Sequence, residues 1–418
     1  MRWIYSLLYT CAFVVGLPYF LLKGMLSGKY LTTFGQRLGG IPLSSDERSL
    51  WIHTVSVGEF LACQVLIKRI KQDMPDVKLF VSTTTLSGQM LAKTVLPEAC
   101  FYFPFDWGWC IRRIFRRIRP GLIVILETEI WPNFMCEARA HKIPMLLING
   151  RISNRSFKRY KLVRRWLPRF DECLMQTEED AEKMKALGAQ NVTVIGNVKY
   201  DFRPPVLPAS LSALLTKWKS ESLLWIAGST MPGEDEIILD AYGKLRKRYP
   251  LKLLIAPRHP ERFQEVADLV ARTGIPFGMR SAEKTEGRDI LILDTIGELA
   301  AAYEFADFAL IGGSLTEPFG GHNPIEPAYF GKAIVNGPGY VNFKAIFEEF
   351  QQKKAVLISA DLQSAVQELI TNPILRKQMG DAAISIIQSN SGATEKAMDR
   401  VRFFWNAVLE PDSKLSVR

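Results

Sequence analysis

The chain has 418 residues, of which 48% are hydrophobic and 23% are charged, a length and composition that fit two globular domains. Disordered, fibrous and disulfide-stapled classes are excluded, because apolar content is high and the 29 Gly and 23 Pro follow no repeat. The net charge is +10, and the excess of Lys and Arg is concentrated at 112–119 and 151–169. Such stretches bind polyanions or form a solvated basic helix face. The six Cys and four His show no zinc-site spacing, so we expect buried thiols and no metal.

Residues 1–25 predict a membrane anchor. The stretch 3–22 carries no charge and, as a helix, is long enough to cross a hydrocarbon core of about 30 Å. More positive charges follow it than precede it, which places the rest of the chain in the cytoplasm. Pro18 and the aromatic residues keep a second interpretation open, a helix that lies in the membrane interface without spanning.

Short apolar runs alternate with amphipathic stretches over 26–200, the predicted N-terminal domain. The runs are 49–55, 77–82, 121–126, 145–149, 172–176 and 192–196. Each has the length and residue types of a buried strand, and the alternation with helices is typical of a parallel α/β sheet. We therefore predict a Rossmann-like domain here, to which the family resemblance given below assigns acceptor binding.

A second series of strands follows a linker. Residues 201–210 hold three Pro and predict the linker. The next apolar runs, within a C-terminal domain over 211–395, are 223–228, 252–256, 290–294, 308–312 and 332–335. We expect an α/β protein with two Rossmann-like domains facing across a cleft. Residues 396–418 are expected to form a C-terminal helix and tail that packs back on the N-terminal domain.

Carboxylates follow two predicted strands of the first domain. Glu59 begins a helix after the strand at 49–55, where it could act as a base with a raised pKa or simply stabilise the helix dipole. Glu127 and Glu129 follow the strand at 121–126 and point to opposite sides. Either could orient a sugar hydroxyl or pair with an Arg of the basic stretch, and the sequence leaves open which one faces the cleft.

Four loops of the second domain have residues suited to a nucleotide. Arg258 lies in a Pro-bounded turn and offers forked donors to a phosphate. The segment 296–299 begins a helix with free amides, and the glycine loop at 312–314 lets the backbone approach a phosphate. In 320–327 (GGHNPIEP), Asn323 would cap a helix and Glu326 would accept hydrogen bonds from a ribose.

These motifs occur in a recognisable order. HTVSVGE, ETEIWPN, PRHPER and GGHNPIEP, behind an apolar N-terminus, resemble those of the 3-deoxy-D-manno-octulosonate (Kdo) transferases specific for lipid A, glycosyltransferases of the GT-B type. The resemblance extends to about residue 350. One departure is the segment 337–343, which lacks the His-Thr expected after Gly-Pro.

The resemblance implies an inverting transfer of Kdo from CMP-Kdo to the lipid A precursor lipid IVA, at the cytoplasmic face of the inner membrane, in lipopolysaccharide biosynthesis. Glu59 matches the catalytic base. The implied CMP-binding residues are Pro257, Arg258, Gly297, Glu298, Leu299, Asn323, Pro324, Ile325 and Glu326. Further candidates are the donor loop of Gly312, Gly313 and Ser314 and two substrate contacts, Glu129 and Lys199. No metal or cofactor is implied.

The expected partners are CMP-Kdo, lipid IVA and anionic lipids of the inner membrane, and no nucleic acid. Two alternatives remain from the residues alone. A nucleotide-sugar epimerase of similar two-domain fold would also use a glycine loop and a ribose-binding Glu, and a non-enzymatic membrane protein could bind anionic lipid through the basic stretches. No motif encodes the number of Kdo residues transferred or the oligomeric state.

Overall fold

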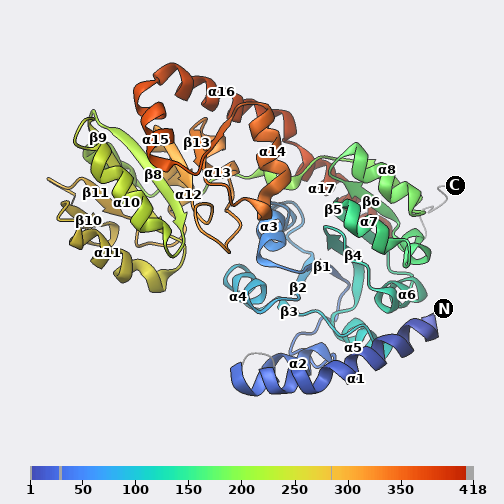
Figure 1. The fold of residues 1–418 in the computed structure, drawn as a ribbon. Helices are drawn as coiled ribbons and strands as arrows, with labels where there is room; N and C mark the ends of the chain where they lie inside the picture. Colours follow the sequence, from blue (N-terminus) through green and yellow to red (C-terminus); the bar gives the residue numbers. More distant parts are fainter. Residues whose placement is uncertain (1, 28–30, 284, 411–418) are drawn as a thin grey trace. The chain divides into compact units, whose positions relative to one another are not determined.

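The computed structural model describes residues 2–27, 31–283 and 285–410, which form two compact units (Figure 1). Unit 1 comprises Met1–Asp201 and Ser391–Arg418, and unit 2 comprises Phe202–Asn390. Each unit contains a seven-stranded sheet whose neighbouring strands are all parallel. The predicted α/β class with two Rossmann-like halves is therefore confirmed.

The sheet of unit 1 has the strand order β3-β2-β1-β4-β5-β6-β7. Its strands are β1 (Ser49–Thr54), β2 (Lys78–Thr83), β3 (Cys100–Tyr102), β4 (Pro120–Leu126), β5 (Met145–Gly150), β6 (Glu172–Met175) and β7 (Val192–Val194). Its α-helices are α1 (Arg2–Ser27), α2 (Leu31–Arg37), α3 (Val57–Asp73), α4 (Leu86–Val95), α5 (Gly108–Ile118), α6 (Pro132–Ala140), α7 (Asn154–Tyr160), α8 (Glu178–Ala186) and α17 (Ala393–Leu409), and its 3-10 helices are η1 (Arg164–Arg169) and η2 (Val198–Asp201).

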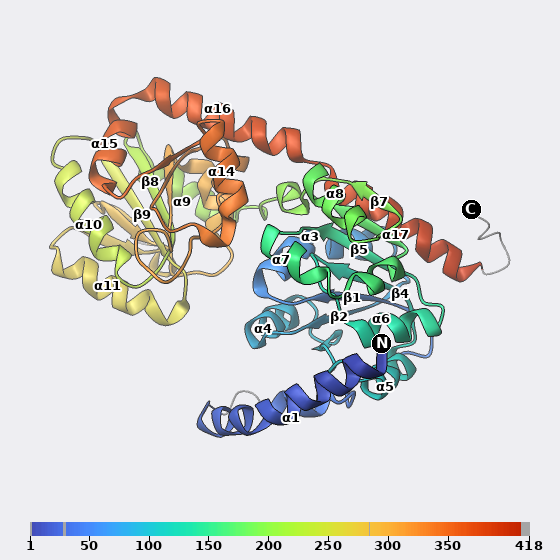
Figure 2. The same ribbon diagram turned by 45° about the vertical axis from the view of Figure 1, so that its right-hand side comes forward.

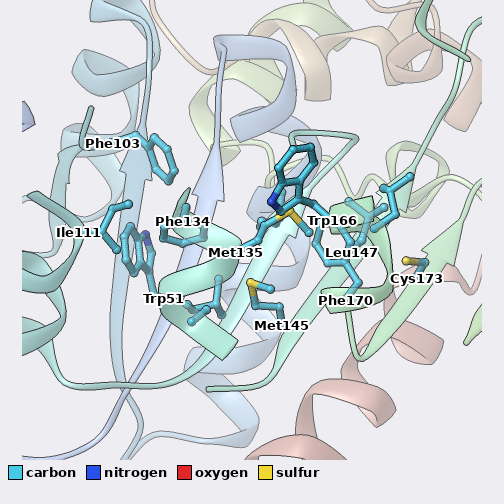
Figure 3. Close-up of a cluster of buried hydrophobic side chains, with 14 of the residues drawn as sticks. Trp51, Phe103, Ile111, Phe134, Met135, Met145, Leu147, Trp166, Phe170 and Cys173 are labelled. Carbon is cyan, nitrogen blue, oxygen red and sulfur yellow. The ribbon is translucent and has the colours of Figure 1, made fainter. Parts of the chain in front are cut away.

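Two hydrophobic cores cover the two faces of this sheet. Along β1, Trp51 belongs to one core, whereas Leu50 and Ile52 belong to the other, because successive side chains of a strand point to opposite faces. Figure 3 shows the first core, in which Trp51 and Phe134 pack with ring centroids 5.1 Å apart. Every residue of β1 and β4 is buried, as expected for central strands of a parallel sheet.

Helix α17 belongs to unit 1, although the whole of unit 2 precedes it in the chain. Its Met398, Val401 and Trp405 lie in the second core of unit 1. Ion pairs connect it to the surface of the unit, for example Arg400 with Glu172 of β6 at 2.7 Å. The rest of the predicted C-terminal tail, 411–418, lies outside the described residues.

Helix α1 packs on unit 1 through one face. Its N-terminal end lies beside α6 (Figure 2). The hydroxyl of Ser6 donates to Oδ1 of Asn133 at 3.1 Å, and the hydroxyl of Thr10 accepts from Nε1 of Trp107 at 2.9 Å. This face of the helix therefore contacts the unit through polar side chains.

The opposite face of α1 is apolar and exposed. Its large exposed side chains are Trp3, Ile4, Leu7, Leu8, Val14, Val15 and Tyr19. Within the described ranges, no helix combines the length and the apolarity needed to cross a membrane. The structure therefore gives no support to the membrane-spanning anchor predicted over 3–22. The helix is two-faced, because its other face carries polar groups that contact the protein.

The sheet of unit 2 has the strand order β10-β11-β9-β8-β12-β13-β14. Its strands are β8 (Leu223–Thr230), β9 (Leu251–Pro257), β10 (Phe277–Met279), β11 (Ile290–Ile292), β12 (Phe308–Ile311), β13 (Ala333–Asn336) and β14 (Val356–Ile358). Its α-helices are α9 (Ala209–Lys219), α10 (Glu234–Leu245), α11 (Phe263–Arg272), α12 (Leu299–Ala302), α13 (Ile325–Tyr329), α14 (Lys344–Gln352), α15 (Leu362–Thr371) and α16 (Pro373–Asn390), and its 3-10 helices are η3 (Pro260–Arg262), η4 (Arg280–Ala282), η5 (Tyr303–Phe305) and η6 (Val341–Phe343).

Strand β8 also alternates between two cores. Trp225 and Ala227 face one core, and Leu224 and Ile226 face the other. Because all strands run in the same direction, their carboxyl ends share one edge of each sheet, and the loops at that edge carry the candidate site residues.

Candidate active site

Glu59 lies in the first turn of α3, directly after β1. Ser56 is the N-cap of this helix, and its side chain accepts a hydrogen bond from the N–H of Glu59 at 3.4 Å. In return, Oε2 of Glu59 accepts from the N–H of Val55 at 2.6 Å. This pattern is a variant of the capping box in which the carboxylate accepts from the residue before the N-cap, so the stabilising role that the sequence suggested for Glu59 is present in the fold.

The electrostatic environment of Glu59 also suits a base. Burial raises the pKa of Glu59 to about 8, and the negative charges of Glu127 and Glu129 add to this rise. The hydrogen bonds from Val55 and Ser56 act in the opposite direction but do not cancel it. A carboxylate with such a pKa is a stronger base than a solvated one and is largely ionised only above pH 8.

Glu127 and Glu129 follow β4, the strand that pairs with β1. Lys199 of η2 lies 3.3 Å from Oε1 of Glu127, so the structure places this predicted substrate contact in an ion pair. Burial raises the pKa of Glu129 to about 7, and the charge of Glu127 raises it further. Both carboxylates interact electrostatically with Glu59. The carboxyl edge of this sheet therefore carries three mutually repelling acids.

A hydroxyl fixes the loop that carries these acids. Oγ1 of Thr128 donates to the carbonyl of Arg151 at 2.6 Å and accepts from the N–H of the same residue at 3.0 Å. The hydroxyl of Tyr160 donates to the carbonyl of Thr128 at 2.8 Å. Both neighbours of Thr128 are thereby held in place, and the two acids are preorganised rather than mobile.

In unit 2, Arg258 and Glu326 interact electrostatically. Arg258 follows β9 with an exposed side chain, and its N–H donates to the carbonyl of Thr230 at 3.0 Å. Burial raises the pKa of Glu326 to about 7, and the charge of Arg258 and a hydrogen bond from Asn323 oppose that rise. Of the predicted CMP-binding residues, Glu326 thus interacts with both Arg258 and Asn323. Pro257, Pro324 and Ile325 are buried beside them.

Two predicted helix starts differ from the structure. Helix α13 begins at Ile325, later than predicted, and Oδ1 of Asn323 accepts from the N–H of Ile325 at 3.1 Å in the turn before it. The segment with Gly297 forms a turn, and α12 begins at Leu299. The carboxylate of Glu298 is engaged by Arg280 at 3.1 Å and by a hydroxyl of its own turn. Both oxygens of this carboxylate therefore accept hydrogen bonds from side chains of the same unit.

The glycine loop after β12 does not offer its amides to a ligand. The N–H of Gly312 donates to the carbonyl of Gly228 at 2.8 Å. The N–H groups of Gly313 and Ser314 donate to the carboxylate of Glu234 at 2.6 and 2.9 Å. Each of these amides therefore already has an acceptor within the unit. A close approach of the glycine backbone to the donor stays a prediction.

Glu234 is not among the functional residues predicted from the sequence. It is completely buried at the start of α10, and the pattern Thr230-Met231-Pro232-Gly233-Glu234 places it directly after a strand. The same strand-to-helix signal drew attention to Glu59. Applied to β8, it would have found Glu234.

The described part of the chain contains no group of three or more His, Cys, Asp or Glu that could hold a metal ion.

Solved structures with the same architecture define the class. The chain resembles the crystal structure of MurG from Acinetobacter baumannii, with a TM-score of 0.55 and 12% identity, over 85% of this chain and 99% of that one. It also resembles UDP-GlcNAc 2-epimerase from Neisseria meningitidis, with a TM-score of 0.51 and 14% identity, over 82% and 99% of the two chains. At these identities the likeness shows the fold alone, which is GT-B-like.

Sequence relatives define the family. A family model described as 3-deoxy-D-manno-octulosonic-acid transferase (kdotransferase) matches residues 32–202. The 3-deoxy-D-manno-octulosonic acid transferase of Haemophilus influenzae is 33% identical over 415 residues, covering 95% of this chain and 97% of the relative. The chain therefore belongs to the Kdo transferase family and is a glycosyltransferase.

Proposed function

We propose that the chain transfers Kdo from CMP-Kdo to lipid IVA in lipopolysaccharide biosynthesis, with Glu59 as the general base. The observation that carries this proposal is the environment of Glu59, whose partial burial and two neighbouring carboxylates raise its pKa to about 8. The membership of the chain in the Kdo transferase family supports Kdo as the transferred sugar. Lipid IVA as the acceptor and Glu59 as the base are the parts that we propose.

In the proposed reaction, the carboxylate of Glu59 removes the proton from an acceptor hydroxyl as that oxygen attacks the anomeric carbon of Kdo. The bond between this carbon and the phosphate oxygen breaks, CMP leaves, and the anomeric centre is inverted. A base with a pKa close to the working pH is favoured for such a step. Glu127 and Glu129 contribute by keeping the basicity of Glu59 high.

Unit 2 supplies the donor site in this proposal. The guanidinium of Arg258 would balance the phosphate charge of CMP-Kdo and stabilise the leaving group. Glu326, with Asn323 beside it, would accept hydrogen bonds from the ribose hydroxyls. The interaction between Arg258 and Glu326 supports this assignment, because both groups can then contact one nucleotide.

The purified chain, incubated with CMP-Kdo and lipid IVA, tests the proposal. Mass spectrometry of the lipid should show one or more added Kdo residues, and the mass increment counts them. A reaction without lipid IVA serves as the control for hydrolysis of the donor. An unchanged lipid, with donor and acceptor shown to be active in a reference reaction, would refute the proposed acceptor. Conversion of UDP-GlcNAc instead would support the epimerase alternative.

We also propose that α1 lies in the interface of the inner membrane, with both units on the cytoplasmic side. The exposed apolar face defined above supports this location, because Trp, Leu and Val on one face of a helix are typical of interfacial helices. The ring of Tyr5 packs 6.1 Å from that of Trp166 in η1, and the exposed Arg164 and Arg165 lie in the same short helix. Cations beside an apolar face favour anionic lipids.

Vesicle flotation tests this location. The chain should float with vesicles that contain phosphatidylglycerol, and replacing Leu7 and Leu8 by Ser should abolish flotation. Ile374→Ser is the matched control, because Ile374 is 69% exposed on α16 of unit 2. Equal flotation of the double variant and the control would contradict the proposal. Protease added to spheroplasts should leave the chain intact if it lies on the cytoplasmic side.

A further inference from the structure

The carboxylate of Glu234 is completely buried and accepts four backbone hydrogen bonds. Oε2 accepts from the N–H groups of Met231 at 2.8 Å and Gly313 at 2.6 Å. Oε1 accepts from the N–H groups of Ser314 at 2.9 Å and Leu315 at 2.8 Å. Met231 follows β8, whereas the other three donors follow β12. One carboxylate thus joins the loops at the ends of two neighbouring strands.

This arrangement changes what the glycine loop can do. A backbone N–H carries one hydrogen, so an amide directed at a carboxylate is not offered to a ligand. A ligand phosphate at the same amides would also lie close to the negative charge of Glu234, and like charges repel strongly where water is excluded. The loop is therefore a support for its neighbours and not a phosphate-binding element.

The loop that Glu234 holds is itself tied to other segments. The carbonyl of Gly313 accepts from the N–H of Gly321 at 2.6 Å. The carbonyl of Ser314 accepts from the N–H of Gly339 at 2.9 Å, and its hydroxyl oxygen accepts from the N–H of Gly337 at 2.9 Å. Hydrogen bonds therefore run from one carboxylate to the loop after β12, then to the loop after β13 and to the turn at Gly321.

The turn at Gly321 leads directly into the predicted nucleotide contacts. Asn323 and Glu326 follow it by two and five residues. The space beside Gly313 is also filled, because a Cβ placed there would lie 3.0 Å from Nε2 of His322. The position of Gly313 therefore determines where the segment 321–326 can lie.

We propose that Glu234 is a positioning residue for the donor half of the reaction. Its carboxylate organises the loops after β8, β12 and β13 so that Asn323 and Glu326 are held in place to bind the nucleotide. The proposal rests on the proposed function of unit 2 as the CMP-Kdo site. Glu234 itself does not contact the donor.

The variant Glu234→Gln tests the role by steady-state kinetics. An amide NH₂ cannot accept, so two of the four donors lose their partner while shape and volume are kept. We expect the KM for CMP-Kdo to rise about tenfold or more, because hydrogen bonds to a charged acceptor are lost. The KM for lipid IVA and the kcat at saturating donor should stay within about twofold. The Kd for CMP alone, measured by calorimetry, should rise in parallel.

Glu236→Gln is the matched control, because Glu236 is exposed in the same first turn of α10 and loses the same charge. Its KM for CMP-Kdo should equal that of the wild type. A Glu234→Gln variant with wild-type KM for CMP-Kdo would overturn the proposal. So would equal losses toward donor and acceptor, since these would indicate a purely structural role.

Amide hydrogen exchange on the wild type gives a second test that needs no variant to fold. The amides of Gly313, Ser314 and Leu315 should exchange slowly without any ligand and should not slow further when CMP is added. Fast exchange that becomes slow only with CMP would mean that these amides bind phosphate, and the proposal would be wrong. Absence of turnover by the wild type would instead refute the proposed function, and the exchange result would still decide the role of Glu234 in holding the loop.

Discussion

Glu59 and Glu234 occupy corresponding places in the two units but differ in their surroundings. Each lies at the start of the helix that follows a central strand, β1 in unit 1 and β8 in unit 2. Glu59 is partly exposed and accepts one backbone hydrogen bond, from Val55. Glu234 is completely buried and accepts four.

The difference shows how the same strand-to-helix junction serves two purposes. A buried carboxylate surrounded by backbone donors has all its hydrogen bonds within the protein and becomes part of the scaffold. A carboxylate with few donors, partial burial and acidic neighbours keeps a high proton affinity and can exchange protons with a substrate. The number of hydrogen-bond donors around the carboxylate therefore distinguishes Glu59, the proposed base, from Glu234, the proposed positioning residue.

The largest expected effect comes from the base. Glu59→Gln should lower kcat for Kdo transfer by about 1,000-fold, within the range that general base catalysis contributes, because an amide cannot take the acceptor proton. Steady-state kinetics with CMP-Kdo and lipid IVA measure this change, and the KM for CMP-Kdo should remain at the wild-type value.

The control for this variant is Glu178→Gln, which alters an exposed first-turn Glu of α8 in the same unit. Its kcat should be that of the wild type. A Glu59→Gln variant that keeps more than about a tenth of wild-type kcat would exclude Glu59 as the base.

Binding of the donor CMP-Kdo should be weakened by substitutions in the proposed donor site of unit 2. Arg258→Gln should raise the KM for CMP-Kdo by about 10- to 100-fold, because a charge-assisted contact to phosphate contributes roughly 1.5–3 kcal/mol. The KM for lipid IVA should be unchanged. Arg272→Gln, at the end of α11, is the control, and an identical KM for both variants would remove Arg258 from the donor site.

For stability, in contrast to activity, the larger effect should come from Glu234 and the smaller one from Glu59. Glu234→Ala should lower the free energy of unfolding by about 3 kcal/mol or more, because it leaves several buried N–H groups without an acceptor. Glu59→Ala should cost no more than about 1 kcal/mol, the usual value of a helix cap. Urea denaturation measures both, and equal losses would mean that donor number does not distinguish the two sites.

The smallest expected effect is a shift of the pH profile. Activity should rise with pH up to about 8, because the base must be ionised and its pKa is raised to about 8. Glu127→Gln removes a negative charge that raises this pKa, so the midpoint should move to lower pH. Glu178→Gln should leave it in place. A midpoint that moves to higher pH would contradict the predicted coupling.

Much of the fold could be predicted from the sequence, because buried parallel strands are nearly continuous apolar runs. The predicted run 121–126 and the observed β4 differ by one residue, and the pattern extends to both sheets. Hydropathy over residues 3–22 counts apolar residues without their direction, so it could not predict which face of α1 packs on the protein. Ser6 and Thr10 share one face of α1 and contact the protein, a fact that only the packing reveals.

The places of the candidate site residues in the fold could be predicted from the sequence, but the contacts between them could not. Glu59, Arg258 and Glu326 lie at the carboxyl edges of their sheets, where the order of strands and motifs placed them. The pairing of Lys199 with Glu127 joins residues 72 positions apart, and that of Glu234 with Gly313 joins residues 79 apart. Such contacts depend on the tertiary fold, and no local spacing encodes them.

The return of α17 to unit 1 has a consequence for the order of folding during synthesis. Unit 2 is one continuous stretch, Phe202–Asn390, and all its residues leave the ribosome before α17 does. Unit 1 lacks Met398, Val401 and Trp405 of its core until α17 has been synthesised. The domain that begins first is thus completed last, and a nascent chain stalled before residue 391 would hold a finished second unit and an open core in the first.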